Sequence, residues 1–124
     1  MVDLLNPNLR ARDLRKLVEP HLFEVNWENG VDETSEWVVA SFEEPKHEEN
    51  LVSWLENKKI SSTTELIITD LSWSNLHYLN WSEFLPELPV YFRDQQVLAI
   101  SSNRSWILEY APQQIARFGR WVKN

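Results

Sequence analysis

Apolar residues recur at helical spacing near the start of the chain. Asn6-Pro7 has the form of a helix N-cap followed by proline at the first helical position. The apolar residues that follow at this spacing are Ala11, Leu14, Leu17 and Val18. Because the residue before a proline avoids the helical region, we expect Pro20 to end this helix.

A second helix is predicted to begin at Pro45. Acidic residues crowd its first turns, which suits the positive end of a helix dipole, and Lys58 and Lys59 stand at its C-terminal end, where cations are favoured. Its apolar stripe consists of Leu51, Val52, Trp54 and Leu55. The loop at residues 61–64 follows it.

Short runs rich in β-branched and aromatic residues, bounded by polar residues, predict strands. They span residues 37–42, 65–69, 97–100 and 105–110. Residues 22–28 alternate weakly and predict a further strand, and residues 90–92 predict an edge strand. We expect Trp37, Trp54 and Trp106 to lie in the core.

The connections between these elements restrict the topology. The four-residue turn at 101–104 predicts an antiparallel hairpin. The strand, helix and strand over residues 37–69 fit a right-handed crossover between parallel strands, although an offset antiparallel arrangement has the same sequence pattern.

Two segments are harder to interpret. Residues 70–85 fit one or two short helices, with Ser82 as a cap and with Pro86 and Pro89 as stops. The tail from Pro112 fits either a helix or a strand that extends the hairpin. Together these elements predict an α+β fold. We expect a single domain over residues 1–124, with a mixed sheet of four to six strands and two to four helices.

No catalytic or cofactor motif is present in the sequence. The chain has no cysteine, which excludes disulfides, thiolate metal sites and a cysteine nucleophile. Its two glycines, Gly30 and Gly119, are isolated, which excludes the glycine-rich loops that bind phosphates and dinucleotides. The three histidines do not have the spacing of a helical metal pair. We therefore expect a non-enzymatic protein without metal or cofactor.

Charge is distributed unevenly along the chain. The net charge is −7, and residues 21–94 hold 15 acidic and 4 basic residues, a local net charge of −11. Such a surface repels nucleic acid and anionic membranes, and it accelerates the encounter with a basic protein. Arg117, Arg120 and Lys123 form a basic group too small to outweigh it. With no signal peptide and no long apolar run in the sequence, we expect a cytoplasmic protein.

An acidic and aromatic segment is the candidate surface for a protein partner. Residues 70–92 contain no Lys or Arg, and their rigid aromatic side chains stand beside carboxylates that can pair with basic groups. The candidate partner-binding residues are Asp70, Trp73, Tyr78, Trp81, Glu83 and Glu87, together with Glu43, Glu44 and Glu48 at the start of the second helix. Two alternatives remain: the aromatic residues form a buried satellite cluster, and the carboxylates form an ordinary solvated face.

Two strings near the C-terminus resemble a known group of proteins. Ser-Trp-Ile-Leu-Glu-Tyr at residues 105–110 and Ile-Ala-Arg-Phe-Gly-Arg-Trp at residues 115–121 look like the C-terminal half of small bacterial proteins. Some of these are similar to immunity proteins of contact-dependent and polymorphic toxin systems. The resemblance implies a non-enzymatic protein that covers the active site or substrate surface of one toxin, and it transfers no functional residue.

The leading hypothesis is an immunity or antitoxin-type inhibitor of a basic, nuclease-like toxin, in which acidic residues imitate phosphate. The alternative is a small bacterial regulatory or housekeeping protein that acts by self-association.

Overall fold

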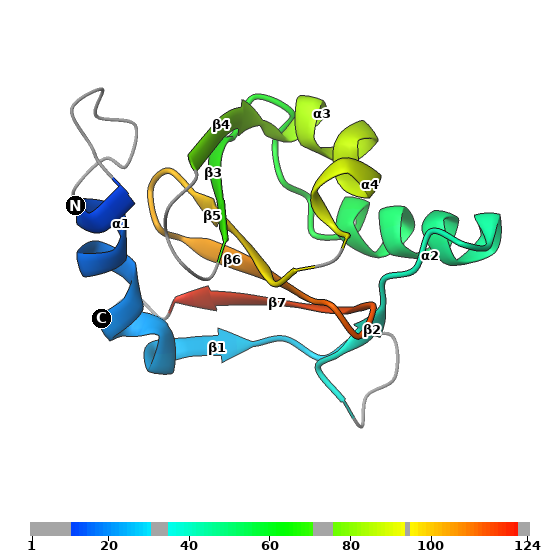
Figure 1. Ribbon diagram of the computed structural model, residues 1–124, viewed down its shortest axis with the longest axis horizontal. Helices are drawn as coiled ribbons and strands as arrows, with labels where there is room; N and C mark the ends of the chain where they lie inside the picture. The colour runs from blue at the N-terminus through cyan, green and yellow to red at the C-terminus, as the bar shows by residue number, and fades with distance from the viewer. Residues whose placement is uncertain (1–10, 31–34, 71–75, 94, 122–124) are drawn as a thin grey trace.

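An antiparallel sheet of seven strands forms the centre of the protein (Figure 1). The computed structural model describes residues 11–30, 35–70, 76–93 and 95–121. The strands are β1 (Val25–Trp27), β2 (Val38–Val39), β3 (Glu65–Asp70), β4 (Leu76–Asn80), β5 (Val97–Ser101), β6 (Trp106–Ala111) and β7 (Ile115–Trp121). Their order is β1-β7-β6-β5-β3-β4, with β2 also paired to β7.

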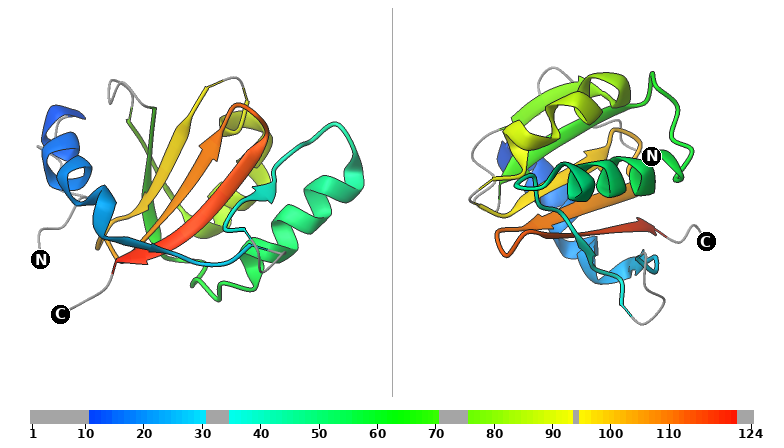
Figure 2. Two further views of the ribbon diagram at one scale, coloured as in Figure 1. Left: turned by 90° about the horizontal axis from the view of Figure 1, so that it is seen from below. Right: turned by 90° about the vertical axis from the view of Figure 1, so that its right-hand side faces the viewer.

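Helices cover both faces of this sheet. The α-helices are α1 (Ala11–Val18), α2 (Pro45–Glu56), α3 (Trp81–Phe84) and α4 (Leu88–Tyr91), and 3₁₀ helices span Glu19–Glu24 and Leu85–Glu87. Figure 2 shows α1 on one side of the sheet and α2 on the other. The α+β class is therefore confirmed, whereas the prediction of a mixed sheet of four to six strands is wrong.

Each face of the sheet has its own hydrophobic core. The larger core lies beneath α2, α3 and α4 and includes Trp54 and Trp106. The smaller core lies beneath α1 and includes Leu14 and Ile67. Strand β3 contributes to both, which explains why it is continuously apolar rather than alternating.

The predicted parallel crossover is absent from the described residues, because β2 and β3 are not neighbours. Strand β3 lies between β4 and β5, and β2 pairs with β7 across the register Val39↔Ile115. β2 is much shorter than the predicted strand 37–42 because β7 begins at Ile115, directly after a turn at Gln114. A further bond between described residues, from Ala40 N–H to the Gln114 carbonyl (2.8 Å), extends this pairing. Trp37, predicted to be in the core, is half-buried.

Residues 70–92 differ most from the prediction. Residues 76–80 form β4 and not a helix, since successive side chains pack on opposite faces of the sheet: Leu76 joins the smaller core and Leu79 the larger one. Pro86 and Pro89 stand in the first turns of new helices, where a missing N–H costs no hydrogen bond. The edge strand predicted at 90–92 is therefore wrong.

The remaining elements follow the sequence pattern more closely. The β5–β6 hairpin and the start of α2 at Pro45 are confirmed, and the ambiguous tail forms the strand β7. The 3₁₀ helix Glu19–Glu24 replaces the first half of the strand predicted at 22–28 and carries the chain through Pro20. The predicted helix start at Asn6-Pro7 lies outside the described residues.

Candidate functional site

The acidic segment predicted from the sequence surrounds the sheet edge at β4 and continues to α4, so that its residues lie on both faces of the sheet. We define this β4–α4 surface by Glu65, Asp70, Tyr78, Glu83, Glu87 and Tyr91. Glu65, Glu83 and Glu87 are exposed, Asp70 is half-buried, and the Tyr78 side chain is 47% exposed. Tyr78 is therefore the one confirmed exposed aromatic among the candidates that the structure describes.

Trp81 is a correction to the predicted partner surface. It is 4% exposed, and its ring centroid lies 5.6 Å from that of Phe84 and 5.4 Å from that of Trp106. Because it belongs to the larger core, Trp81 offers almost no contact area to a partner. Trp73, the other predicted indole anchor, lies outside the described residues.

The chain turns from β4 into α3 at Asn80, and this turn fixes the position of Glu83. The Asn80 N–H donates to Glu83 Oε1 (3.0 Å), and the Glu83 N–H donates to Asn80 Oδ1 (2.9 Å), which is a capping box. Ser82, predicted to be the cap, donates instead to Asn80 Oδ1 (2.7 Å). The capping box holds the Glu83 carboxylate beside the end of β4.

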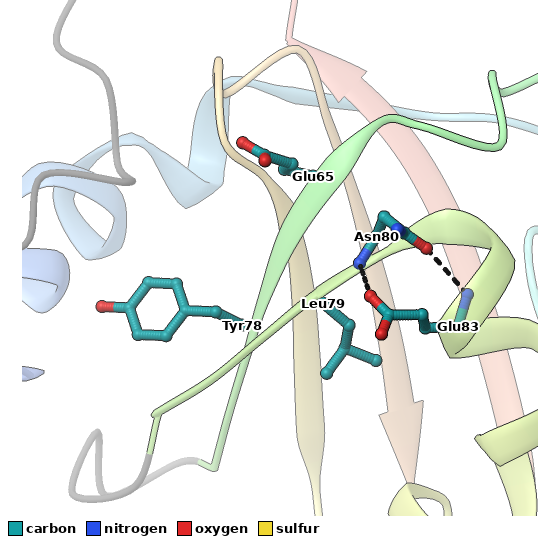
Figure 3. A pocket seen from close by; sticks show the side chains of 5 residues that line it. All are labelled: Glu65, Tyr78, Leu79, Asn80 and Glu83. Carbon is teal, nitrogen blue, oxygen red and sulfur yellow. Dashed lines mark hydrogen bonds between the residues drawn. The ribbon is translucent and has the colours of Figure 1, made fainter.

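A small pocket of about 170 Å³ lies at this end of β4 (Figure 3). It is lined by Glu65, Tyr78, Leu79, Asn80 and Glu83. Figure 3 shows Glu83 turned back onto Asn80, with the Tyr78 ring extended to the other side. Two carboxylates from β3 and α3 therefore border one pocket that no basic residue lines.

A second pocket of about 290 Å³ is bordered by β3, β4 and α4. Asp70, His77, Val90 and Tyr91 are among its lining residues, and the His77 and Tyr91 ring centroids lie 5.7 Å apart. Burial, and then the negative charges of Glu87 and Glu83, raise the pKa of the Tyr91 phenol above its ordinary value. Burial is the larger cause of this shift, and the two carboxylates add to it.

The three acidic candidates at the start of α2, Glu43, Glu44 and Glu48, lie in three different environments. Glu43 lines a separate pocket of about 550 Å³ with Pro89 of α4 and with Arg93. Glu44 lies 3.7 Å from His47 Nε2 on its own helix, and Glu48 is half-buried. Glu43 is thus brought near α4, whereas Glu44 contacts only its own helical turn among the ion pairs of the described residues.

A charged cluster on the α1 face of the sheet was missed by the sequence analysis. Arg117 on β7 donates from Nε to Glu109 Oε1 on β6 (2.8 Å) and also pairs with Glu36. Its guanidinium carbon lies 3.7 Å from the centre of the Trp27 ring and 4.6 Å from that of Trp37. The sequence signal was a single acid, Glu109, within an otherwise apolar strand.

Two members of the predicted C-terminal basic group, Arg117 and Arg120, form ion pairs within this chain. The Glu109 side chain is accessible over only 11% of its surface and is held by Arg117, while Arg120 Nε donates to Glu28 Oε2 (2.7 Å). Arg117 and Arg120 are therefore engaged by carboxylates of this chain, which disfavours their use as phosphate contacts. Lys123 lies outside the described residues.

The part of the chain that the structure describes contains neither a cluster of metal ligands nor a membrane-spanning helix. No group of three or more His, Cys, Asp or Glu side chains there is placed to hold a metal ion. Within the same residues, no helix is both long enough and apolar enough to cross a lipid bilayer. No family model, curated protein or solved structure matches this chain.

Proposed function

We propose that this protein binds a basic protein through the β4–α4 surface and acts as an immunity or antitoxin-type inhibitor of a nuclease-like toxin. One observation carries the proposal. Residues 60–92 contribute four acids, Glu65, Asp70, Glu83 and Glu87, and no Lys or Arg, and three of these acids are exposed. The surface they form also presents the exposed phenol of Tyr78.

Charge and contact area together suit this surface to a basic partner. A concentrated negative potential accelerates association with a positively charged protein and disfavours partners of like charge. A tyrosine ring adds a large contact area that loses little conformational entropy on binding. Toxins that cleave nucleic acid carry basic sites for phosphates, so a rigid group of carboxylates is chemically suited to cover such a site.

The resemblance at residues 105–121 supports the proposal only indirectly. These residues form β6 and β7 in the middle of the sheet, where most of them are buried. They therefore belong to the scaffold of the fold and not to the β4–α4 surface. The proposal rests on the surface itself.

Self-association is the second candidate function, and one observation favours it. Phe23 is 83% exposed and belongs to the 3₁₀ helix Glu19–Glu24, which leads into the edge strand β1. An exposed apolar ring can pack against the same ring of a second copy. A mass that rises with protein concentration in sedimentation, and that falls to the monomer value in Phe23→Ser, would favour this candidate.

Matched charge variants test the leading proposal. Immobilised protein is used to isolate its partner from cells that naturally contain it, and association is then measured against salt concentration. We expect the Glu65→Lys/Glu87→Lys variant to slow association by at least about tenfold at low salt, because both positions lie on the proposed surface. The Glu49→Lys/Glu56→Lys variant is the matched control. It has the same net charge, but its substitutions lie on α2, outside the proposed surface.

A comparison of the association rates of these two variants tests whether the β4–α4 surface or the net charge governs binding. Equal association rates for both would show that net charge, and not the β4–α4 surface, governs binding. An association rate that does not change with salt would remove the electrostatic argument altogether, since exposed charges are screened beyond about 10 Å at 0.1 M ionic strength.

A further inference from the structure

We infer that β4 is a docking strand: an extended basic segment of the partner adds to the sheet beside β4 and bonds to its backbone. This inference rests on the proposed function and deepens it, because it states how the partner is held. Among the described residues, β4 pairs with β3 alone and ends the sheet. Within the part of the chain that the structure describes, its outer side therefore has the geometry of an open sheet edge.

The register shows which backbone groups face outward. The Ser102 N–H donates to the Glu65 carbonyl (2.9 Å), so alternate residues of β3, beginning with Glu65, bond toward β5. Leu66 and Ile68 consequently bond toward β4, where they pair with Leu79 and His77.

The bond from Trp81 N–H to the Thr64 carbonyl (2.8 Å) continues the same alternation. On β4, the N–H and C=O groups of Leu76, Tyr78 and Asn80 therefore point away from β3. The Asn80 N–H is occupied by Glu83, as described above. Leu76 and Tyr78 keep outward donors and acceptors for which no partner is found among the described residues.

Strand β4 also lacks the features that usually protect a sheet edge. Such edges are normally interrupted by proline, lysine or a bulge, or are kept very short. β4 has five residues, Leu-His-Tyr-Leu-Asn, in an unbroken register with β3. The opposite edge is different, because β1 and β2 contribute three and two residues beside β7 and are separated in the chain by residues 28–37.

Side-chain pockets lie on both faces of β4, as strand addition requires. Ile67, the partner of Tyr78, belongs to the core beneath α1, so Tyr78 lies on that face, beside Glu65. His77 lies on the opposite face, in the pocket that contains Asp70 and Tyr91. Because successive residues of an added strand point to opposite faces, both pockets can receive its side chains.

The charge of these pockets selects a basic occupant. Glu65 and Glu83 line the first pocket, Asp70 lines the second, and neither pocket is lined by Lys or Arg. A second copy of this chain would bring identical carboxylates against them, which disfavours it as the occupant. An extended segment with Arg or Lys at alternate positions is complementary to both the backbone edge and the charge.

A peptide of about eight residues with alternating arginine and valine serves as the probe. Amide hydrogen exchange of the intact protein is measured by NMR with and without this peptide. We expect exchange of the Tyr78 amide to slow by at least about tenfold, since its N–H becomes bonded to the added strand. The His77 and Leu79 amides already bond toward β3 and serve as internal controls. A peptide with glutamate in place of arginine should have no effect.

Two variants distinguish the contribution of the Tyr78 backbone N–H to peptide binding from that of its side chain. Tyr78→Pro removes the outward N–H without removing a bond to β3, a position that edge strands tolerate. Tyr78→Ala removes the ring and keeps the N–H. We expect the proline variant to bind the peptide at least about tenfold more weakly than the alanine variant, the loss that corresponds to about one hydrogen bond. Melting temperatures show whether each variant is folded.

The possible results distinguish this inference from the proposed function. If the peptide binds and Glu65→Lys/Glu87→Lys abolishes binding, but the Tyr78 amide exchanges at its original rate, the surface is used through side chains and the docking strand is wrong. Failure of the arginine peptide to bind at all also overturns the docking strand. If the Tyr78 amide is protected only at high protein concentration, the occupant is a second copy, and the basic partner is wrong.

Discussion

Tyr78 and Trp81 stand three residues apart in the sequence but differ completely in exposure. Tyr78 lies on an open strand, whereas Trp81 is enclosed by Phe84 and Trp106 in the larger core. Composition alone gives both residues the same aromatic character, so the sequence could not separate them. The separation comes from Asn80, where the alternation of a strand gives way to a helical turn.

Trp81→Ala should destabilise the protein by about 3–5 kcal/mol, because it removes a large aromatic side chain from a packed core. Urea denaturation measures the free energy of unfolding. Tyr78→Ala is the matched control and should cost less than about 1 kcal/mol, since half of its side chain already faces solvent. A stable Trp81→Ala protein with weakened partner binding would instead restore Trp81 as a surface anchor.

At the scale of elements, the sequence predicts the features that depend on neighbouring residues, but it does not predict which strands pair. Pro45 with the acidic turn after it marks α2, and the four-residue turn at 101–104 marks the β5–β6 hairpin. Both are determined by residues close in the sequence. Strand β4 has no such local marker, because its identity depends on alternating contacts with two separate cores.

The same division applies to the candidate site: its charge was predicted from the sequence, but the residues that strand pairing brings to it were not. Its charge follows directly from the sequence, since Asp70, Glu83 and Glu87 lie close together in a segment free of basic residues. Glu65 was not predicted, because it joins these acids only through the pairing of β3 with β4. Arg117 was misjudged for the same reason: its partners Glu109 and Glu36 are brought to it by the sheet and by the loop after β1.

The capping box at Asn80 yields a prediction at this scale. Asn80→Ala should destabilise the protein by about 1 kcal/mol, because it removes the side-chain acceptor that satisfies the Glu83 N–H. Ser82→Ala is the control, since Ser82 only donates to Asn80 and caps no backbone group in the described structure. Thermal and urea unfolding of the two variants measure the difference. A larger loss in Ser82→Ala would mean that Ser82 is the true cap.

At the scale of the whole molecule, one carboxylate links three distant segments. Glu28 follows β1, and it accepts hydrogen bonds from Lys58 Nζ (2.8 Å), just after α2, and from Arg120 Nε (2.7 Å) on β7. Lys58 also lies 4.7 Å from the centre of the Trp54 ring and 5.1 Å from that of Phe118. Glu28 therefore joins the sheet edge to the end of the longest helix in the described structure.

The ionisation of Glu28 should consequently control part of the acid stability. Burial raises the pKa of this carboxyl, but the hydrogen bonds and charges of Lys58 and Arg120 outweigh burial, so its pKa in the folded protein lies below the ordinary value. As the pH falls, the unfolded chain takes up the proton first. The stabilisation by Glu28 is therefore complete at neutral pH and is lost as the pH falls through the depressed folded pKa.

Glu28→Gln tests this sign. The variant should be less stable than the natural protein at neutral pH, and the difference should shrink as the pH is lowered through the depressed pKa of Glu28, where the natural protein loses the same charge. Urea unfolding at a series of pH values measures both proteins. Glu49→Gln removes an exposed carboxylate of α2 and should change stability by no more than about 0.5 kcal/mol throughout. A difference for Glu28→Gln that stays constant or grows on acidification would show that its ion pairs do not hold these three segments together.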